Sequence, residues 1–109
     1  MAERPGYVEG RHFSEYVDRV RRLRRRHRED QAIALLLRLV AATEAEAKAS
    51  GGGVAPWYYW QLAVAYRKLG RRRDEIRILE RFSRQKHAPG ARPPKLMARL
   101  AKLRTVSSP

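Results

Sequence analysis

The chain has 109 residues, of which 25 are Lys or Arg and 11 are Asp or Glu, so its formal net charge is +14 at pH 7. This length fits one domain that buries roughly 60 to 70 per cent of its unfolded surface and needs no disulfide or metal to stabilise its core. Cysteine is absent, which excludes disulfides and thiolate metal sites. Residues 1–13 lack the apolar stretch of a secretion signal, and the longest apolar run, residues 32–37, is too short to span a bilayer. We therefore expect a cytoplasmic protein with no membrane partner.

A first helix is predicted over residues 14–26, after a flexible segment at residues 1–13. Ser14 provides a capping hydroxyl, and Glu15 and Asp18 place anions in the first turn. Arginines cover most of the helix surface, while its apolar residues recur at spacings of three and four. These apolar residues are Phe13, Tyr16, Val17, Val20 and Leu23.

A second helix is predicted to begin at Glu29 and Asp30 and to continue to Ala49, where residues 51–53 are all glycine. Its apolar side chains spread over more than one face, which a surface helix would not show. The second helix must therefore contact neighbours on two sides.

Three more helices follow in the pattern. Pro56 suits the first turn of a third helix that ends at Gly70, and Asp74 opens a fourth helix that ends near Gln85. Residues 87–93 contain two prolines and a glycine and are predicted to be a loop. Pro94 begins a fifth helix with an apolar side, and residues 105–109 are expected to fray. One domain at residues 14–104 results.

Residues 56–82 resemble one tetratricopeptide repeat, a pair of antiparallel helices. Tyr59 stands at the tryptophan position of that family, and Leu62, Ala63 and Tyr66 stand at its leucine, small-residue and tyrosine positions. Glu75 occupies the small position of the second helix, which suggests looser packing there.

Residues 14–40 form a weaker second copy of this pattern. Arg19 stands where the family has leucine, whereas Ala32 keeps the small position of the second helix. Leu23 and Tyr66 occupy equivalent places 43 residues apart, which exceeds the family period of about 34. The resemblance implies an all-α fold: a short right-handed superhelix of two helical hairpins with a C-terminal capping helix. A generic antiparallel helical bundle is the alternative.

No catalytic or cofactor constellation is recognisable. His12, His27 and His87 are scattered, without a partner at metal-ligand spacing. Ser14 has no nucleophile-elbow motif, and residues 51–53 lack the lysine and hydroxyl of a phosphate loop. We expect neither catalysis nor a cofactor nor a metal.

The resemblance also implies a binding groove, because the first helices of successive repeats line the concave face in this family. Cations and two indoles would lie there together, as in the family members that bind acidic peptide ends, although the asparagines of such grooves are absent. Packing of Trp57 and Trp60 against Phe13 or the fifth helix is an alternative. The candidate partner-binding residues are Arg21, Arg24, Arg25, Trp57, Trp60, Val64, Arg67 and Lys68.

A second basic group lies at the turns within the two helical pairs. Equivalent turns of a stacked repeat protein lie along one edge, so these arginines could follow the phosphates of a nucleic acid, or could simply be solvated. The candidate residues are Arg26, Arg28, Arg71, Arg72 and Arg73.

The first hypothesis is thus a non-catalytic adaptor that binds an acidic or amphipathic segment of a protein partner. The alternative is a nucleic-acid-binding protein without sequence specificity, which uses the turn arginines and the fifth helix. A homo-oligomer is a third hypothesis, because two repeats are fewer than the usual three.

Overall fold

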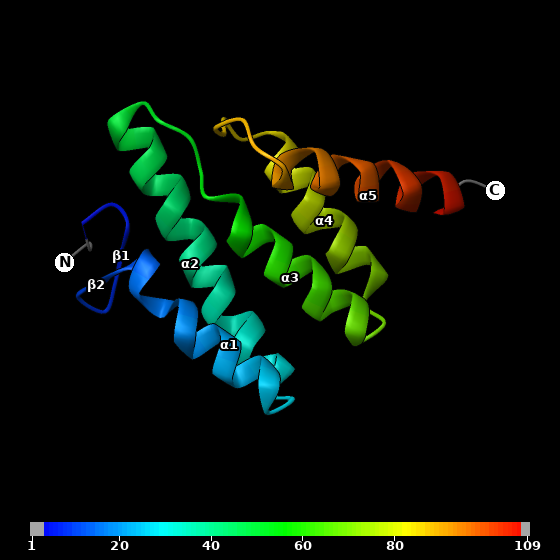
Figure 1. The fold of residues 1–109 in the computed structure, drawn as a ribbon, viewed down its shortest axis with the longest axis horizontal. Coiled ribbons are helices and arrows are strands. Elements are labelled where there is room, and N and C mark those ends of the chain that lie inside the picture. Colours follow the sequence, from blue (N-terminus) through cyan, green and yellow to red (C-terminus); the bar gives the residue numbers. More distant parts are fainter. Residues whose placement is uncertain (1–3, 108–109) are drawn as a thin grey trace.

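The computed structural model describes residues 4–107, and most of them are helical (Figure 1). Successive helices pack against one another, and α5 also contacts α3. The predicted mainly helical class and the order of five helices are confirmed for the described residues, with a small two-stranded sheet in addition. The elements are β1 (Tyr7–Val8), β2 (Arg11–His12), the 3-10 helix η1 (Phe13–Tyr16), α1 (Val17–Arg25), α2 (Glu29–Ser50), α3 (Pro56–Lys68), α4 (Arg72–Ser83) and α5 (Arg92–Ser107).

The segment before α1 differs from the expected flexible extension. Strands β1 and β2 pair antiparallel, and the two residues between them, Glu9 and Gly10, both have positive φ angles, of 50° and 80°. Two such residues make the tight turn whose twist matches a hairpin. Val8 is buried, and the Tyr16 hydroxyl donates a hydrogen bond to the Val8 carbonyl. The hairpin was missed because its strands are too short for an alternating pattern.

The cap of the first helical segment is His12 instead of Ser14. The Ser14 backbone N–H donates to His12 Nδ1, and the His12 backbone N–H donates to the Glu15 carboxylate. This reciprocal pair of bonds is a capping box, which satisfies two donors at a helix start. The segment starts as a 3-10 turn and becomes α-helical at Val17.

The turns within the pairs α1–α2 and α3–α4 have the same backbone geometry. His27 and Gly70 have left-handed φ angles of 56° and 70°, and the predicted end of the third helix at Gly70 is confirmed. The next residues, Arg28 and Arg71, each donate their N–H to the carbonyl five residues earlier, both at 2.9 Å. This is the Schellman arrangement of a helix end. The 43-residue spacing seen in the sequence is therefore repeated in the backbone.

Helix α5 begins at Arg92, two residues before the predicted start, and continues to Ser107. Its buried side chains face α3 and α4, while most of the others are exposed. Three of the six buried residues of α3 have a buried counterpart in α5 at a spacing of 34 residues. These pairs are Tyr59 and Pro93, Leu62 and Leu96, and Tyr66 and Leu100.

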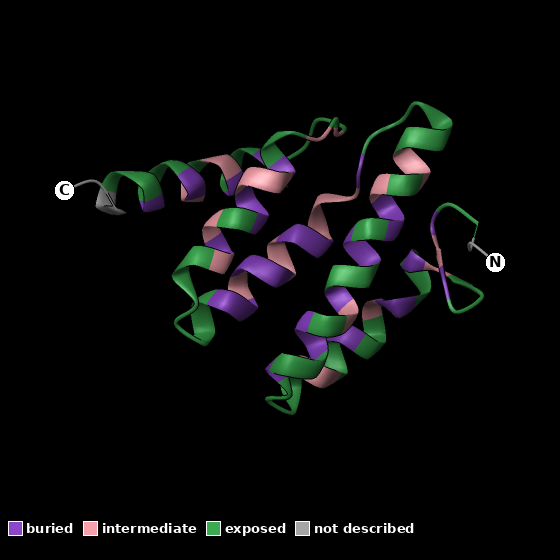
Figure 2. Cartoon of the chain, turned by 180° about the vertical axis from the view of Figure 1, so that it is seen from behind, coloured by how far each residue is buried: buried purple, intermediate pink, exposed green. Residues whose placement is uncertain are grey.

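The buried residues lie on all five α-helices (Figure 2, purple), and two buried tyrosines, Tyr58 and Tyr59, form hydrogen bonds between elements of the core. The Tyr58 hydroxyl donates to the Phe13 carbonyl at 3.0 Å, and burial raises the pKa of Tyr58 to about 12. The Tyr59 hydroxyl donates to Glu44 at 2.7 Å, and Arg81 pairs with both oxygens of that carboxylate. Burial, followed by the hydrogen bond to Glu44, raises the pKa of Tyr59. These contacts join η1, α2, α3 and α4.

Candidate partner-binding face

The accessible side of α3 lies between α1 and α5. Trp57, Trp60, Gln61 and Val64 on this side are half-buried, whereas Tyr58 and Tyr59 next to them face the core. The spacings of three and four place these accessible residues on one face of the helix. The α1–α3–α5 face is defined here by Arg21, Arg24, Arg25, Trp57, Trp60, Gln61, Val64, Arg67, Lys68, Lys95 and Arg99.

Helix α1 contributes two arginines that reach α3. The Arg21 guanidinium carbon lies 5.8 Å from the centre of the Trp57 ring, within the range of a cation–π contact. Arg24 Nη1 donates to Gln61 Oε1 at 2.7 Å. The predicted proximity of α1 cations and α3 indoles is thus present for Arg21 and Trp57.

Packing of the indoles against Phe13 or the fifth helix was the alternative, and at Phe13 the ring contact is made by Tyr58 instead of an indole. Tyr58 packs edge-on against Phe13, with ring centres 5.3 Å apart. Trp57 packs edge-on against Tyr58, with ring centres 5.0 Å apart, and keeps part of its surface accessible.

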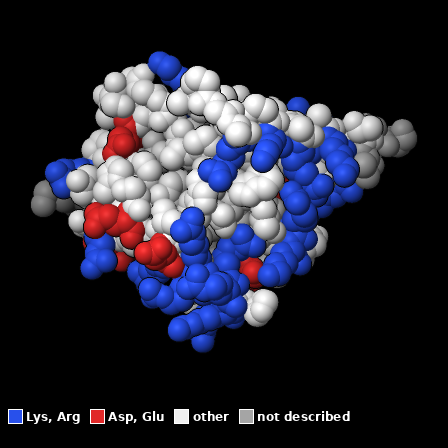
Figure 3. All heavy atoms as spheres, viewed as in Figure 1, with Lys and Arg blue, Asp and Glu red and all other residues white. Residues whose placement is uncertain are grey.

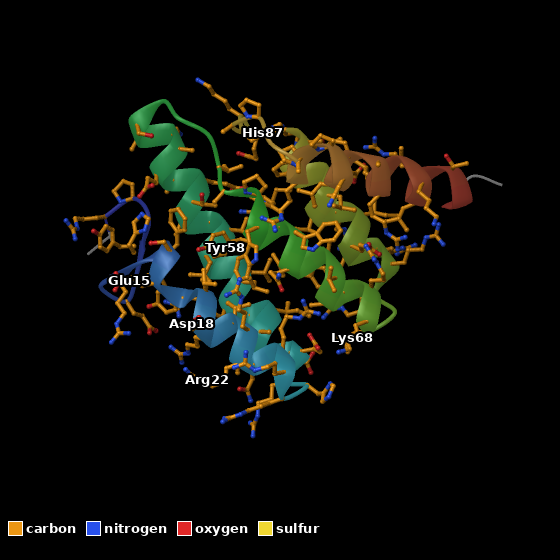
Figure 4. The ribbon with its side chains drawn as sticks, in the orientation of Figure 1. Glu15, Asp18, Arg22, Tyr58, Lys68 and His87 are labelled. Carbon is orange, nitrogen blue, oxygen red and sulfur yellow. The ribbon has the colours of Figure 1, made fainter. Side chains whose placement is uncertain are left out.

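A buried carboxylate at the start of α2 pairs with two of the predicted binding cations. Glu29 is 6% exposed, and its Oε2 lies 3.4 Å from Arg24 Nε. Its Oε1 lies 3.5 Å from Lys68 Nζ and has no hydrogen-bond partner among the described residues. Lys68 thereby places the end of α3 beside the α1–α2 turn (Figure 4). Glu29 therefore links α1, α2 and α3.

A second buried carboxylate acts in the same way for α3, α4 and α5. Glu75 is 1% exposed, and its Oε2 lies 3.1 Å from Arg67 Nε and 2.8 Å from Arg99 Nε. The small position of the expected repeat thus holds a carboxylate that two arginines satisfy. Desolvating this acid is tolerable because it is paired on both sides.

Acidic residues concentrate on two of the helices, whereas basic residues occur on all five. Helices α3 and α5 contain no Asp or Glu and α1 contains only Asp18, whereas α2 contains four acidic residues and α4 contains three. Lys and Arg side chains form a band over the α1–α2 turn, the end of α3 and α5, beside an uncharged area (Figure 3). Arg21, Arg25 and Lys95 form no ion pair with a carboxylate in the part of the chain that the structure describes.

The turn arginines have unequal surroundings. Arg26, Arg28 and Arg73 are exposed. Arg71 pairs with Asp74 at 2.8 Å and lies over the Tyr66 ring, and Arg72 donates to the Leu103 carbonyl at 2.9 Å. Arg71 and Arg72 are exposed as well but have structural contacts, so Arg26, Arg28 and Arg73 are better placed to meet a ligand.

Beside the hairpin, His12 and the neighbouring Ser14 meet the carboxylate of Glu46, which lies 34 residues after His12 in the sequence. Ser14 Oγ lies 2.8 Å from His12 Nδ1, and His12 Nε2 lies 2.5 Å from Glu46 Oε2. With the proton on Nε2, the ring donates to Glu46 and accepts at Nδ1 from Ser14. Because the same His12 atom caps η1, we interpret this chain as a clamp between the hairpin and α2.

Burial of Glu29 and Glu75 was not predicted, and neither was the contact with Gln61. An acid at a helix start ordinarily indicates a favourable charge at the helix dipole, which accounts for both glutamates without burial. The available signal was Glu75 at a position where the repeat pattern has a small residue.

No protein-family model, curated protein or solved structure matches the chain. Within residues 4–107, no helix combines the length and apolar character needed to cross a bilayer. The same range contains no group of three or more His, Asp or Glu side chains arranged to hold a metal ion.

Proposed function

We propose that this protein is a non-catalytic, cytoplasmic interaction module that binds an acidic or amphipathic segment of a protein partner on its α1–α3–α5 face. The observation that carries the proposal is the combination of two half-buried indoles with cations on helices that almost lack acidic residues. Aromatic and arginine side chains dominate binding energy at protein interfaces. An acidic segment would meet complementary charge there.

The fold proposed for this module is a tetratricopeptide-like superhelix. Two helical pairs with the same turn geometry, 43 residues apart, support a repeat. The three buried positions that α5 shares with α3 at a spacing of 34 residues fit the first helix of a further repeat, which would cap the array. The exposed, mostly polar outer side of α5 suits that capping role.

The predicted binding residues divide into two groups. Arg21, Arg25, Trp57, Trp60 and Val64 are proposed to contact the partner directly. Three other cations pair with buried carboxylates of the protein itself. These ion pairs would hold them in place on the face, where they would also attract an acidic partner. The three cations are Arg24, Arg67 and Lys68.

The test is titration with a synthetic acidic amphipathic peptide and with its Asn/Gln counterpart. Trp57→Ala combined with Trp60→Ala should weaken binding of the acidic peptide by more than about 2 kcal/mol, because buried aromatic anchors dominate affinity. The matched control is Arg77→Gln with Arg84→Gln, which removes two exposed charges from the α4 region. If both variants lost the same amount of affinity, general charge attraction would account for the binding, and this outcome would contradict the proposed face.

The second candidate function is nucleic-acid binding without sequence specificity. It is favoured by the basic band that joins the two turns and α5 in Figure 3. The appropriate variant is Arg26→Gln with Arg28→Gln and Arg73→Gln, since Arg71 and Arg72 have structural contacts. If oligonucleotides bind there, affinity should fall across unrelated sequences and the salt dependence should flatten by up to about 3 units of slope. An unchanged slope would reject this candidate.

Self-association of the chain is the third proposal. Leu37 and Leu69 are the exposed large hydrophobic residues found in the described part. A sedimentation experiment over a range of concentrations measures the oligomeric state directly, and a monomer throughout would reject a homo-oligomer.

A further inference from the structure

An open pocket of 430 Å³ lies at the end of the α1–α3–α5 face where α3 and α5 begin. Trp60 and Pro56 of α3 form one side, and the α4–α5 loop and the first turn of α5 form the other. Sites of this volume hold small ligands or single large side chains. The lining residues share an apolar or cationic character, with no Asp or Glu among Pro56, Trp60, Ala88, Pro89, Gly90, Ala91, Arg92, Pro93 and Lys95.

The wall opposite Trp60 is held in place by contacts between two loops. The Val54 backbone N–H donates to the Lys86 carbonyl at 2.8 Å, and His87 stacks on Phe82 with ring centres 4.9 Å apart. Gly53 approaches so closely that an added Cβ would lie 2.7 Å from His87 Cα. Pro93, at the start of α5, is buried. Because this wall is already held in place, less conformational entropy is lost when a ligand binds.

The charges around the pocket have one sign. Arg92 and Lys95 are exposed, and neither forms an ion pair with a carboxylate within residues 4–107. Trp60 is half-buried and presents an aromatic surface between these cations and α3. An occupant must therefore combine an aromatic or apolar body with nearby negative charge.

We propose that this pocket takes one aromatic side chain of the partner segment, with an Asp or Glu beside it that pairs with Lys95 or Arg92. The inference rests on the proposed function and adds the specificity of the same face. An aromatic occupant is favoured over an aliphatic one because aromatic pairs gain energy beyond the area that they bury. The prolines and alanines of the wall supply the remaining apolar contact without competing polar groups.

The experiment uses the full chain with Trp57→Phe, which leaves Trp60 as the single tryptophan, since the sequence has two. Three synthetic peptides are compared by Trp60 fluorescence and calorimetry: an acidic peptide with one central Phe, the same peptide with Ala instead, and the Phe peptide with all acids amidated. The Phe-containing acidic peptide should bind about tenfold or more tightly than either relative and should change the Trp60 emission.

Two variants locate the effect. Ala91→Phe fills the pocket from an exposed position without adding a second indole, and it should reduce binding of the Phe peptide to the level of the Ala peptide. Lys95→Gln should weaken binding more than the matched Lys102→Gln, which lies on the same helix outside the pocket lining. Circular dichroism of each variant checks that the helices are retained.

The outcomes separate the two proposals. Equal affinity for the Phe and Ala acidic peptides would overturn the pocket assignment and leave the protein-binding module standing. No binding of any acidic peptide would overturn both. Tight binding of a single-stranded oligonucleotide that displaces the Phe peptide and is lost in Ala91→Phe would assign the pocket to a nucleic-acid base and overturn the aromatic side-chain assignment.

Discussion

At the scale of single residues, the α1–α2 and α3–α4 turns adopt the same left-handed backbone conformation with different residues. His27 and Gly70 occupy equivalent left-handed positions. Only glycine reaches this conformation without a steric penalty from Cβ. The α1–α2 turn therefore carries strain that the α3–α4 turn avoids.

This difference predicts opposite effects of exchange at the two turns. His27→Gly should stabilise the protein by about 0.5 to 1 kcal/mol, and Gly70→Ala should destabilise it by about 1 kcal/mol. No atom lies within 4 Å of a Cβ built on Gly70, so the cost is conformational and not a clash. Gly90→Ala, where the φ angle is not positive and the space is open, is the control. Urea denaturation measures all three, and destabilisation by His27→Gly would contradict the strain.

At the scale of elements, the helices are joined by buried acids as well as by apolar packing. Glu75 receives Arg67 from α3 and Arg99 from α5, while Glu80 on the same helix pairs with Arg104 at the surface. Removing a buried partner leaves charges unpaired, whereas an exposed ion pair contributes little.

Glu75→Ala should therefore lower the free energy of unfolding by about 1 to 3 kcal/mol, because two guanidiniums lose their shared carboxylate. Glu80→Ala should change it by less than about 1 kcal/mol. Thermal and urea melts of the two variants provide the comparison. A similarly small change in both variants would mean that Arg67 and Arg99 are solvated without loss of stability when Glu75 is removed, which would contradict the prediction.

At the scale of the whole molecule, buried tyrosines make the fold sensitive to alkaline pH. Burial raises the pKa of Tyr58 from 10.0 to about 12, and the pKa values of Tyr59 and Tyr66 are also raised. The unfolded chain loses these protons first, so the stabilisation is complete below pH 10.0 and is lost as the pH rises toward the folded pKa.

The urea midpoint should consequently fall between pH 10 and 12, with tyrosinate absorbance that appears together with unfolding. In Tyr58→Phe, the free energy of unfolding should fall less steeply with pH, by about 1.4 kcal/mol per pH unit, because one titrating proton is removed. A pH slope identical to that of the unsubstituted protein would exclude Tyr58 as a contributor.

The sequence alone was sufficient to predict the helices, because their determinants are local. Apolar residues at spacings of three and four mark each buried face, and Pro56, Gly70 and the glycines at 51–53 mark ends that the structure keeps. The 43-residue relation between the two pairs was visible for the same reason. The hairpin at Tyr7–His12 was missed, since two-residue strands carry no period.

The candidate site depended on information that a local pattern does not contain. Arg24, Arg67 and Lys68 look alike in sequence to Arg21 and Arg25, but the first three meet Glu29 or Glu75 and the last two do not. A long charged side chain takes its partner from whichever helix face the fold brings near. Sequence periodicity therefore determined which residues are buried along each helix. Only the tertiary structure decided which cations are neutralised and where a pocket forms beside Trp60, because both depend on contacts between helices far apart in the chain.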